Sequence, residues 1–201
     1  MSDLHTLPNH GLGWLDASGE HAGVVLSTRI RLARNLQGHA FGPRARVNDR
    51  EAVLEQTRRA MDKVELLAGS TLLALPDLDH RSRGMLLERR LASRELLGDV
   101  KVGPSRATAV LLAAQDPLSV MVNEEDHLRL QGLVSGLRLK EAWDQVDRLD
   151  EELGQELPFA YHHEFGFLTS CPTNVGSGLR ASVLVHLPGL VLTKEIGKVL
   201  Q

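Results

Sequence analysis

Three separated stretches of this 201-residue chain carry side chains whose types and spacing could do chemistry. The first holds Arg29, Arg31 and Arg34 behind a short apolar run. If residues 24–31 are extended, Arg29 and Arg31 point to the same side of the strand. Two guanidinium groups on one face can bracket a phosphate chain, because each can bond two oxygen atoms at once. A solvated basic edge is the alternative interpretation of this spacing.

The second stretch, residues 123–127, directly follows an apolar run of strand length and contains three consecutive acids, Glu124, Glu125 and Asp126. Carboxylates this close raise one another's pKa unless cations or a metal ion intervene. Such a group suits a general base or a magnesium-linked site, and Arg129 is a nearby counter-charge. A plain acidic turn is the alternative interpretation.

The third stretch, residues 170–180, is a loop of turn-forming residues around the only cysteine, Cys171. Free backbone amides and Arg180 would lower the pKa of this thiol, and Gly176 and Gly178 would let the backbone approach an anion. A small buried hydrophobe is the alternative role for a lone cysteine. One cysteine excludes an intramolecular disulfide and a cysteine-based zinc site, and the nine histidines suggest no metal site.

The bulk composition narrows the class of protein. With 42% hydrophobic and 24% charged residues, the chain is typical of a soluble globular protein. A net charge of -3 argues against polyanion binding by bulk attraction, and 3% aromatic residues argue against a platform for single-stranded nucleic acid. The apolar runs are too short to span a bilayer and no signal peptide is visible, so a cytoplasmic location is expected.

Hydrophobic periodicity predicts the elements that must position these residues. Asn48 and Glu51 have capping-box spacing at the start of a helix that Gly69 would end. Residues 1–22 are expected to form a loose N-terminal lead. The predicted helices are 48–68, 78–97, 138–153 and 188–200, and the predicted strands are 71–75, 107–114, 118–122, 165–169 and 181–187.

Residues 25–35, 122–129 and 168–181 together resemble one known family. In this order, they resemble the phosphate-binding arginine segment, the Asn-Glu-Glu-Asp-His signature and the reactive-cysteine signature of the ATP:guanidino phosphotransferase (phosphagen kinase) family. The resemblance runs from about residue 24 to the end of the chain. The short N-terminal lead and residues 180–188 are similar to the bacterial protein-arginine kinase branch of that family.

The resemblance implies an α+β fold with an antiparallel sheet flanked by helices, of the glutamine-synthetase/guanidino-kinase kind. It divides the chain into the lead, 1–22, and a partial phosphotransferase domain, 23–201, which would be incomplete at its C-terminus. An exposed apolar sheet edge and self-association are therefore expected. Arg90 stands where relatives often place a histidine near the adenine.

The resemblance also implies a reaction, the transfer of the γ-phosphoryl group of ATP, with Mg²⁺, to arginine guanidinium groups in proteins. Those proteins would be its partners, and the family suggests a repressor and a Clp unfoldase system as further partners. The implied roles are Arg29, Arg31, Arg129 and Arg180 as clamps on the ATP phosphates, Ser27 and Thr28 beside the nucleotide, Glu125 as the base, Glu124 beside it, and Cys171 as a thiolate against the guanidinium.

Two functions follow from these observations. The favoured hypothesis is a protein-arginine kinase, with weak or absent activity in these 201 residues because the family's domain continues beyond them. The alternative is a non-catalytic regulator that binds a nucleotide or phospho-arginine, in which the arginine clamp survives without the chemistry. Neither direct nucleic-acid binding nor membrane association is expected in either case.

Overall fold

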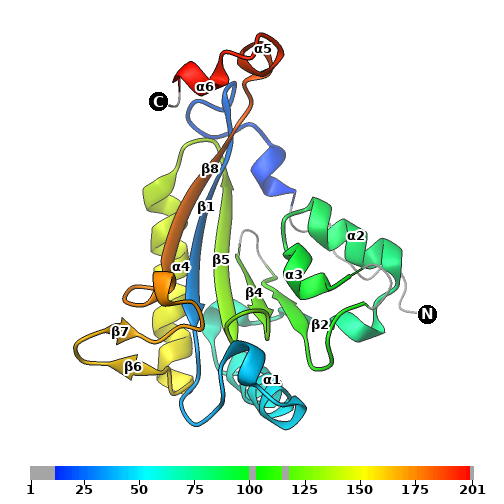
Figure 1. The fold of residues 1–201 in the computed structure, drawn as a ribbon, viewed down its shortest axis with the longest axis vertical. Coiled ribbons are helices and arrows are strands. Elements are labelled where there is room, and N and C mark those ends of the chain that lie inside the picture. The colour runs from blue at the N-terminus through cyan, green and yellow to red at the C-terminus, as the bar shows by residue number, and fades with distance from the viewer. Residues whose placement is uncertain (1–11, 100–102, 115–117, 200–201) are drawn as a thin grey trace.

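A six-stranded antiparallel sheet forms the centre of the fold (Figure 1). The structure, a computed structural model, describes residues 12–99, 103–114 and 118–199. In the order of pairing, the strands are β2 (Thr71–Ala74), β3 (Ala109–Leu112), β4 (Leu118–Val122), β5 (Leu128–Ser135), β1 (Val25–Arg34) and β8 (Leu179–Val185). A separate two-stranded sheet pairs β6 (Tyr161–His162) with β7 (Gly166–Phe167). The predicted α+β class, with an antiparallel sheet flanked by helices, is confirmed.

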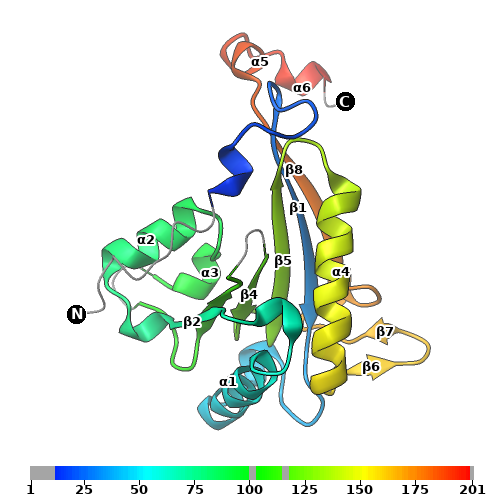
Figure 2. The ribbon, with the colours of Figure 1, turned by 180° about the vertical axis from the view of Figure 1, so that it is seen from behind.

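Helices cover the two faces of the large sheet unequally. On one face lie α1 (Val47–Met61) and α4 (Leu139–Glu156), and α4 runs across β5 and β1 (Figure 2). On the other face, α2 (His80–Glu88) and α3 (Arg94–Leu97) pack against β3 and β4. In the described part of the chain, the second face of β5 and β1 is covered by the short turn η2 (Gly13–Leu15) and, through Arg90, by the loop between α2 and α3. We call the second face of β5, β1 and β8 the open face.

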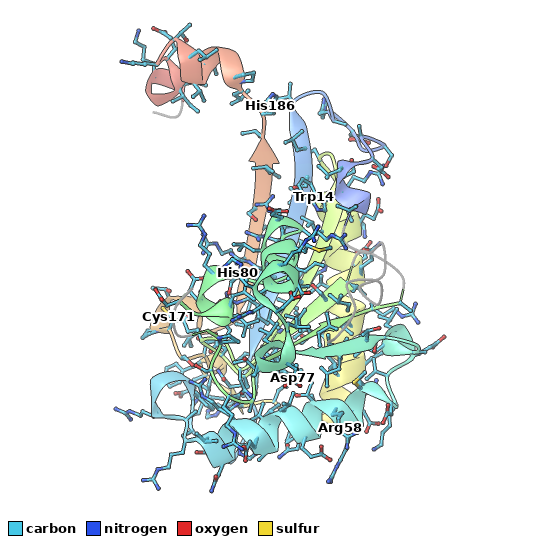
Figure 3. The ribbon with its side chains drawn as sticks, turned by 90° about the vertical axis from the view of Figure 1, so that its right-hand side faces the viewer. Trp14, Arg58, Asp77, His80, Cys171 and His186 are labelled. Carbon is cyan, nitrogen blue, oxygen red and sulfur yellow. The ribbon has the colours of Figure 1, made fainter. Side chains whose placement is uncertain are left out.

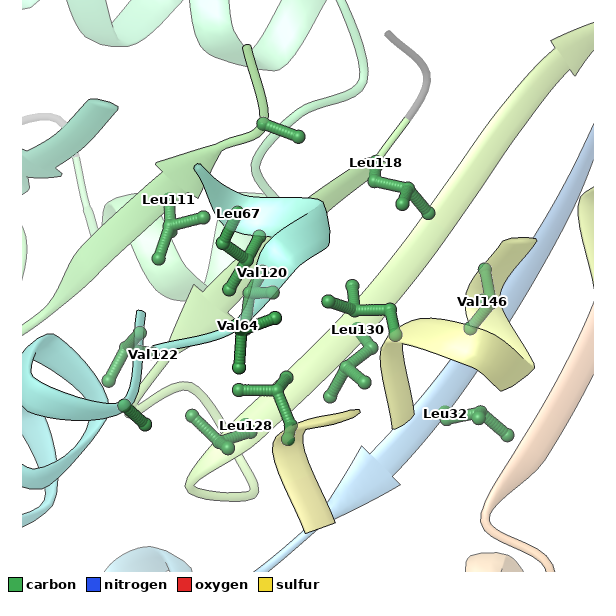
Figure 4. Packing of buried hydrophobic residues seen from close by; sticks show 14 of the residues in the cluster. Leu32, Val64, Leu67, Leu111, Leu118, Val120, Val122, Leu128, Leu130 and Val146 are labelled. Carbon is green, nitrogen blue, oxygen red and sulfur yellow. The ribbon is translucent and has the colours of Figure 1, made fainter. Parts of the chain in front are cut away.

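Buried aliphatic side chains fix α4 to the sheet (Figure 4). Leu32 of β1, Leu130 of β5 and Val146 of α4 are at most 1% exposed. A Cβ atom at Gly132 would lie 2.7 Å from Val146 Cγ2, so glycine at this position lets the helix approach β5 closely. Burial of each such aliphatic side chain stabilises the fold by roughly 1.5–3 kcal/mol. This packing holds the register of β1 and so decides which of its residues reach the open face.

The first long helix begins and ends earlier than predicted. Its N-cap is Arg46, whose backbone N–H donates to Asp49 Oδ2 at 3.1 Å, and the helix ends at Met61 rather than at residue 68. The capping box predicted at Asn48 is therefore wrong, because the chain turns into the helix two residues upstream of it. A short 3-10 turn, Glu65–Leu67, replaces the last predicted turns of the helix.

Two other predicted helices are each divided in two. The helix predicted over 78–97 breaks between α2 and α3, where Arg90 has a φ of 63°. The helix predicted over 188–200 becomes α5 (Pro188–Leu192) and α6 (Ile196–Val199), separated at Lys194 with a φ of 59°. A residue in the left-handed conformation cannot continue a right-handed helix, so each of these residues ends a helix.

The strand β5, at the centre of the sheet, was not predicted. Leu128 and Leu130 alternate with Arg129 and Gln131, as a strand requires, but Gly132 interrupts the alternation. The strand predicted over 118–122 is β4 with those bounds, and the other predicted strands exist with shorter or shifted bounds. The turn of the hairpin predicted between β3 and β4, residues 115–117, lies outside the described residues.

The N-terminal lead is not loose throughout, because Trp14 of η2 is only 9% exposed. At the other end of the chain, β8 is the edge strand of the sheet, and its Val183 and Val185 are exposed. An exposed apolar edge was expected from the sequence. The helices α5 and α6 lie beyond one end of the sheet (Figure 1). Among the residues that the structure describes, no helix is both long and apolar enough to cross a membrane.

Candidate active site

Four arginines predicted to clamp phosphates project from the open face of three adjacent strands. Arg31 of β1 is paired with Arg180 of β8, and Arg29 precedes it by two residues, so all three side chains lie on one face. Ala33, two residues further along β1, is paired with Arg129 of β5. Stretches more than fifty residues apart in sequence therefore bring Arg29, Arg31, Arg129 and Arg180 together, as the sequence predicts.

The electrostatics of this row show that its charges repel one another. Burial and, in decreasing order, the charges of Arg31, Arg90, Arg180 and Arg129 together lower the pKa of Arg29 to about 10. Burial, followed by Arg129 and Arg180, also lowers the pKa of Arg31. The Nε atom of Arg29 is buried and has no hydrogen-bond partner among the described residues. A bound anion would relieve both the repulsion and the unsatisfied donor.

Arg90 belongs to the same row, although its role was not predicted. Its Nη1 donates to Ser27 Oγ at 3.2 Å, and its guanidinium carbon lies 5.7 Å from the centroid of the Trp14 ring. Burial lowers the pKa of Arg90 as well. The only sequence signal for Arg90 was that it stands where relatives often have a histidine. The direction of the Arg90 side chain depends on the break between α2 and α3, which was not predicted. Trp14 lies nearer than Cys171 to the end of the sheet that carries His186 (Figure 3).

The two glutamates that precede β5 have different environments. Glu124 has a buried side chain, 2% exposed, and its Oε1 accepts hydrogen bonds from Arg129 Nη1 at 2.7 Å and from Ser93 Oγ at 2.5 Å. Glu125 is 47% exposed, with its Oε2 3.6 Å from Arg129 Nη2. Glu124 therefore fixes Arg129, whereas Glu125 is the carboxylate that can meet an incoming group.

The neighbouring Asp126 ties the second predicted stretch to the third. Its buried Oδ1 accepts hydrogen bonds from Asn35 Nδ2 at 2.7 Å and from the backbone N–H of Ser170 at 2.6 Å. Ser170 Oγ donates in return to the backbone carbonyl of Glu125 at 2.7 Å. These bonds hold Glu125 and the Cys171 loop in a fixed relation. Neither Asn35 nor Ser170 was singled out from the sequence.

His127 completes this support as a neutral ring. Its Nδ1 accepts from the backbone N–H of Leu36 at 3.0 Å, so Nε2 carries the proton and donates to the Ala40 carbonyl at 3.1 Å. Burial lowers the pKa of His127, which keeps the ring neutral. His127 therefore positions the chain after β1 and does not face the substrate.

The Cys171 loop is shaped by contacts with neighbouring strands and within itself. The half-buried Cys171 Sγ lies 2.9 Å from Thr173 Oγ1. A Cβ at Gly178 would lie 2.6 Å from the Ala33 carbonyl oxygen, so glycine lets the loop close onto β1. Gly176 exchanges backbone hydrogen bonds with Phe167 of β7. That Gly176 and Gly178 let the backbone approach an anion stays a prediction, and Gly178 lines a small cavity beside Arg31 and Arg180.

Two residues near the arginine row point away from the open face. Thr28 is fully buried, and its Oγ1 donates to the Gly136 carbonyl at 2.6 Å and accepts from the Arg138 N–H at 3.1 Å. Arg34 makes two hydrogen bonds to Asp150 of α4, at 2.8 and 2.6 Å. Strand alternation explains both directions. This geometry does not support a side-chain contact from Thr28 to a nucleotide on the open face, whereas Ser27 does lie there.

A cavity of about 740 Å³ joins the arginines and the glutamates. Its wall includes Arg31, Arg129, Arg180, Glu125 and, from the Cys171 loop, Ser170. A smaller cavity of about 80 Å³ lies beside it and is lined by several of the same residues. Three of the four predicted clamp arginines, Arg31, Arg129 and Arg180, therefore border one space with the predicted base.

The residues of this space fit ATP with Mg²⁺. The unsatisfied donor and the repelling cations suit a triphosphate. In the described parts of the chain, no three His, Cys, Asp or Glu side chains form a group that could hold a metal ion alone. Mg²⁺ needs no such cage beside a nucleotide, because phosphate oxygens, water and one or two carboxylates suffice. Glu124 and Glu125 are the carboxylates that border the cavity near the arginines.

Comparisons with known proteins agree with this geometry. Residues 52–201 match the family model described as ATP:guanido phosphotransferase, C-terminal catalytic domain. Protein-arginine kinase from Pelotomaculum thermopropionicum is 43% identical over 203 residues, covering 100% of this chain and 56% of the relative. The corresponding protein from Symbiobacterium thermophilum is 43% identical over 188 residues, covering 92% and 52%. The chain thus spans about half the length of the curated relatives it matches.

Solved structures support the fold. The substrate-free duplicated taurocyamine kinase from Schistosoma mansoni has a TM-score of 0.73 at 26% identity, covering 94% of this chain and 27% of the other. The same kinase with bound transition-state-analogue components has a TM-score of 0.74 at 24% identity, covering 86% and 25%. The sheet and its flanking helices are therefore those of a guanidino kinase.

Proposed function

Because the chain belongs to the ATP:guanido phosphotransferase family, we propose that it transfers the γ-phosphoryl group of ATP to arginine side chains of proteins. The observation that carries the proposal is the row of Arg29, Arg31, Arg129 and Arg180 on one open sheet face, ending at Glu125. Phosphoryl transfer requires in-line placement and cancellation of charge, and the positive charge of this row supports the second requirement.

The order of the side chains sets the direction of the nucleotide. Ser27 and Arg31 are four residues apart on β1, or about 13 Å. The terminal phosphates would lie against Arg31, Arg129 and Arg180, next to Glu125, because the acceptor must meet the γ-phosphorus there. The nucleoside would then extend past Arg29 towards Ser27 and Arg90.

In the proposed reaction, Glu125 orients the acceptor guanidinium and takes its proton as the new N–P bond forms. The bond between the γ-phosphorus and the bridging oxygen breaks, and the charge that remains on the leaving diphosphate is stabilised by Arg29 and Arg31. Glu124 holds Arg129 in place. By resemblance to the family, the sulfur of Cys171 would keep the guanidinium in register. When bound, Mg²⁺ neutralises further charge on the phosphate oxygens.

Several finer parts of the proposal stay predictions from the sequence and from the resemblance. They are the phosphotransferase domain at 23–201 with its lead at 1–22, the cytoplasmic location, the repressor and Clp unfoldase system as partners, and self-association. The buried Trp14 supports a lead that packs on the domain.

The proposal is tested by calorimetry with Mg-ATP together with an assay for acid-labile phosphate on protein arginine. We expect ATP to bind, and we expect a slow transfer that Glu125→Gln lowers far more than it lowers ATP affinity. If Glu125→Gln left transfer unchanged, the assignment of the base would be wrong. Binding of ATP without any transfer would favour the non-catalytic regulator. No binding would overturn both functions.

A further inference from the structure

The large cavity extends beyond the chemistry described so far. On the side away from Arg31 and Arg180, its wall consists of side chains from α1, α3 and the segment before β3. We call this part the distal lobe, and it is lined by Arg50, Glu95, Leu96, Ser105 and Thr108. The nucleotide and the acceptor guanidinium do not need these residues, because the arginine row and Glu125 already account for both.

Arg50 is fixed close to the two glutamates. The buried Asn123 donates through Nδ2 to the Arg50 carbonyl oxygen at 2.8 Å and to the Ala107 carbonyl oxygen at 2.7 Å. Glu124 and Glu125 follow Asn123 directly in the chain. The first turns of α1 are thus held beside the carboxylate that would receive the acceptor, so Arg50 stands at a defined place relative to Glu125.

The charges of the distal lobe are not used by the fold. Within the described residues, neither Arg50 nor Glu95 forms an ion pair. Other arginines of α1 do form ion pairs: Arg58 and Arg59 both pair with Glu55. A half-buried arginine that lines a cavity without an anion is free to bind one from outside.

We propose that the distal lobe binds a carboxylate of the guanidino substrate through Arg50. The inference rests on the proposed function, because Glu125 holds the guanidinium and the remainder of the substrate must extend from it. The carboxylate has two sources with one chemistry: the α-carboxylate of free arginine, or an Asp or Glu side chain next to the target arginine in a protein. Glu95 accepts an N–H from the same substrate and disfavours a second carboxylate in the lobe.

The test measures binding of fluorescently labelled peptides by anisotropy in the presence of Mg-ADP. The peptides contain one arginine followed by Asp, Asn or Lys and are otherwise identical. We expect the Asp peptide to bind about tenfold more tightly than the Asn peptide, the effect of one charge-assisted contact at a half-buried site. Arg50→Met should remove this difference, and Arg50→Glu should make the Lys peptide the tightest. The surface variant Arg59→Met is the matched control and should keep the wild-type preference.

Free L-arginine and agmatine, which lacks the carboxylate, form the second arm and compete against a labelled peptide. An advantage of L-arginine over agmatine that Arg50→Met abolishes would support the α-carboxylate as the source. An Arg50-dependent advantage of the Asp peptide would support the flanking side chain. If neither advantage depended on Arg50, the inference would be overturned. If guanidino ligands bound in a way that depended on Glu125 but not on Arg50, only the inference about the distal lobe would be overturned. If neither ATP nor the peptides bound, the inference and the proposed function would both be overturned.

Discussion

The repulsion within the arginine row predicts a variant that gains stability while it loses function. In the ligand-free protein, Arg29 holds a partly buried charge beside other arginines and has an unsatisfied Nε donor. Methionine in its place would fill similar space without charge. We therefore expect Arg29→Met to raise the free energy of unfolding in the absence of nucleotide and to weaken ATP binding about tenfold to a hundredfold.

The size of the gain follows from the pKa of Arg29. The fall of this pKa to about 10 corresponds to roughly 3 kcal/mol against the charged form. The guanidinium is partly exposed and water screens it, so we discount this figure to about 1–2 kcal/mol. Because the pKa of a cation is lowered on folding, the full penalty is present below about pH 10 and is relieved as the pH rises from 10 towards 12.5. At neutral pH the arginine is charged and the penalty is complete.

A matched variant on the same strand should behave in the opposite way. Arg34 is 3% exposed, donates twice to Asp150, and lies 3.6 Å from the centroid of the Phe167 ring. Its removal would leave a carboxylate in a largely buried position without its cation. We expect Arg34→Met to lower the free energy of unfolding by about 3–5 kcal/mol.

Urea denaturation of both variants and the wild type, with and without Mg-ATP, measures these differences. At an ATP concentration 100 times the dissociation constant, the wild type should gain about 2.7 kcal/mol, and Arg29→Met should gain much less at the same concentration. If ligand-free Arg29→Met unfolded as readily as Arg34→Met, the arginine row would be held by contacts within the protein. The argument for an anion site built on repulsion would then fail.

Three further predictions concern the supports of the site. Asp126→Asn should lower turnover and alter the alkylation rate of Cys171 while leaving ATP affinity within about twofold, because its hydrogen bonds hold the acceptor side only; calorimetry and iodoacetamide kinetics test this. Arg90→Ala should change the fluorescence emission of Trp14, which Arg90 contacts, and should weaken ATP binding in calorimetry. An unchanged ATP affinity would place Arg90 outside the nucleotide site. Because burial lowers the pKa of His127, stability should fall as the pH drops below about 6.5, and His127→Gln should flatten that dependence in pH-resolved melts.

Strand alternation explains how much of the site could be predicted. Once residues near Arg29 and Arg31 are taken as extended, period two places both on one face and would place Arg34 on the other. Arg34 was grouped with Arg29 and Arg31 from the sequence, although its odd spacing from both already predicted the opposite face. The resemblance of the motif segments grouped Arg129 and Arg180 with Arg31, and the strand registers place these three side chains on one face.

The supporting contacts could not be predicted in this way. Asp126 meets Asn35 across 91 residues of sequence and Ser170 across 44. Such pairings depend on the strand order of the sheet, in which β5 lies beside β1. Because β5 itself was not predicted, no local pattern could reveal that the acidic stretch and the cysteine loop share a hydrogen-bonded carboxylate.

The alternation of side chains along β1 both creates the arginine row and fixes its position on the open face. On β1, Ile30 and Leu32 are buried against α4, between the arginines that face the other way. A shift of one residue in register would drive Arg29 and Arg31 into the apolar core and expose the two aliphatic side chains. The aliphatic packing is worth more than the roughly 1–2 kcal/mol of repulsion in the row, so the register holds before any nucleotide arrives. The arginines are thus preorganised for an anion by the apolar core on the opposite face of the sheet.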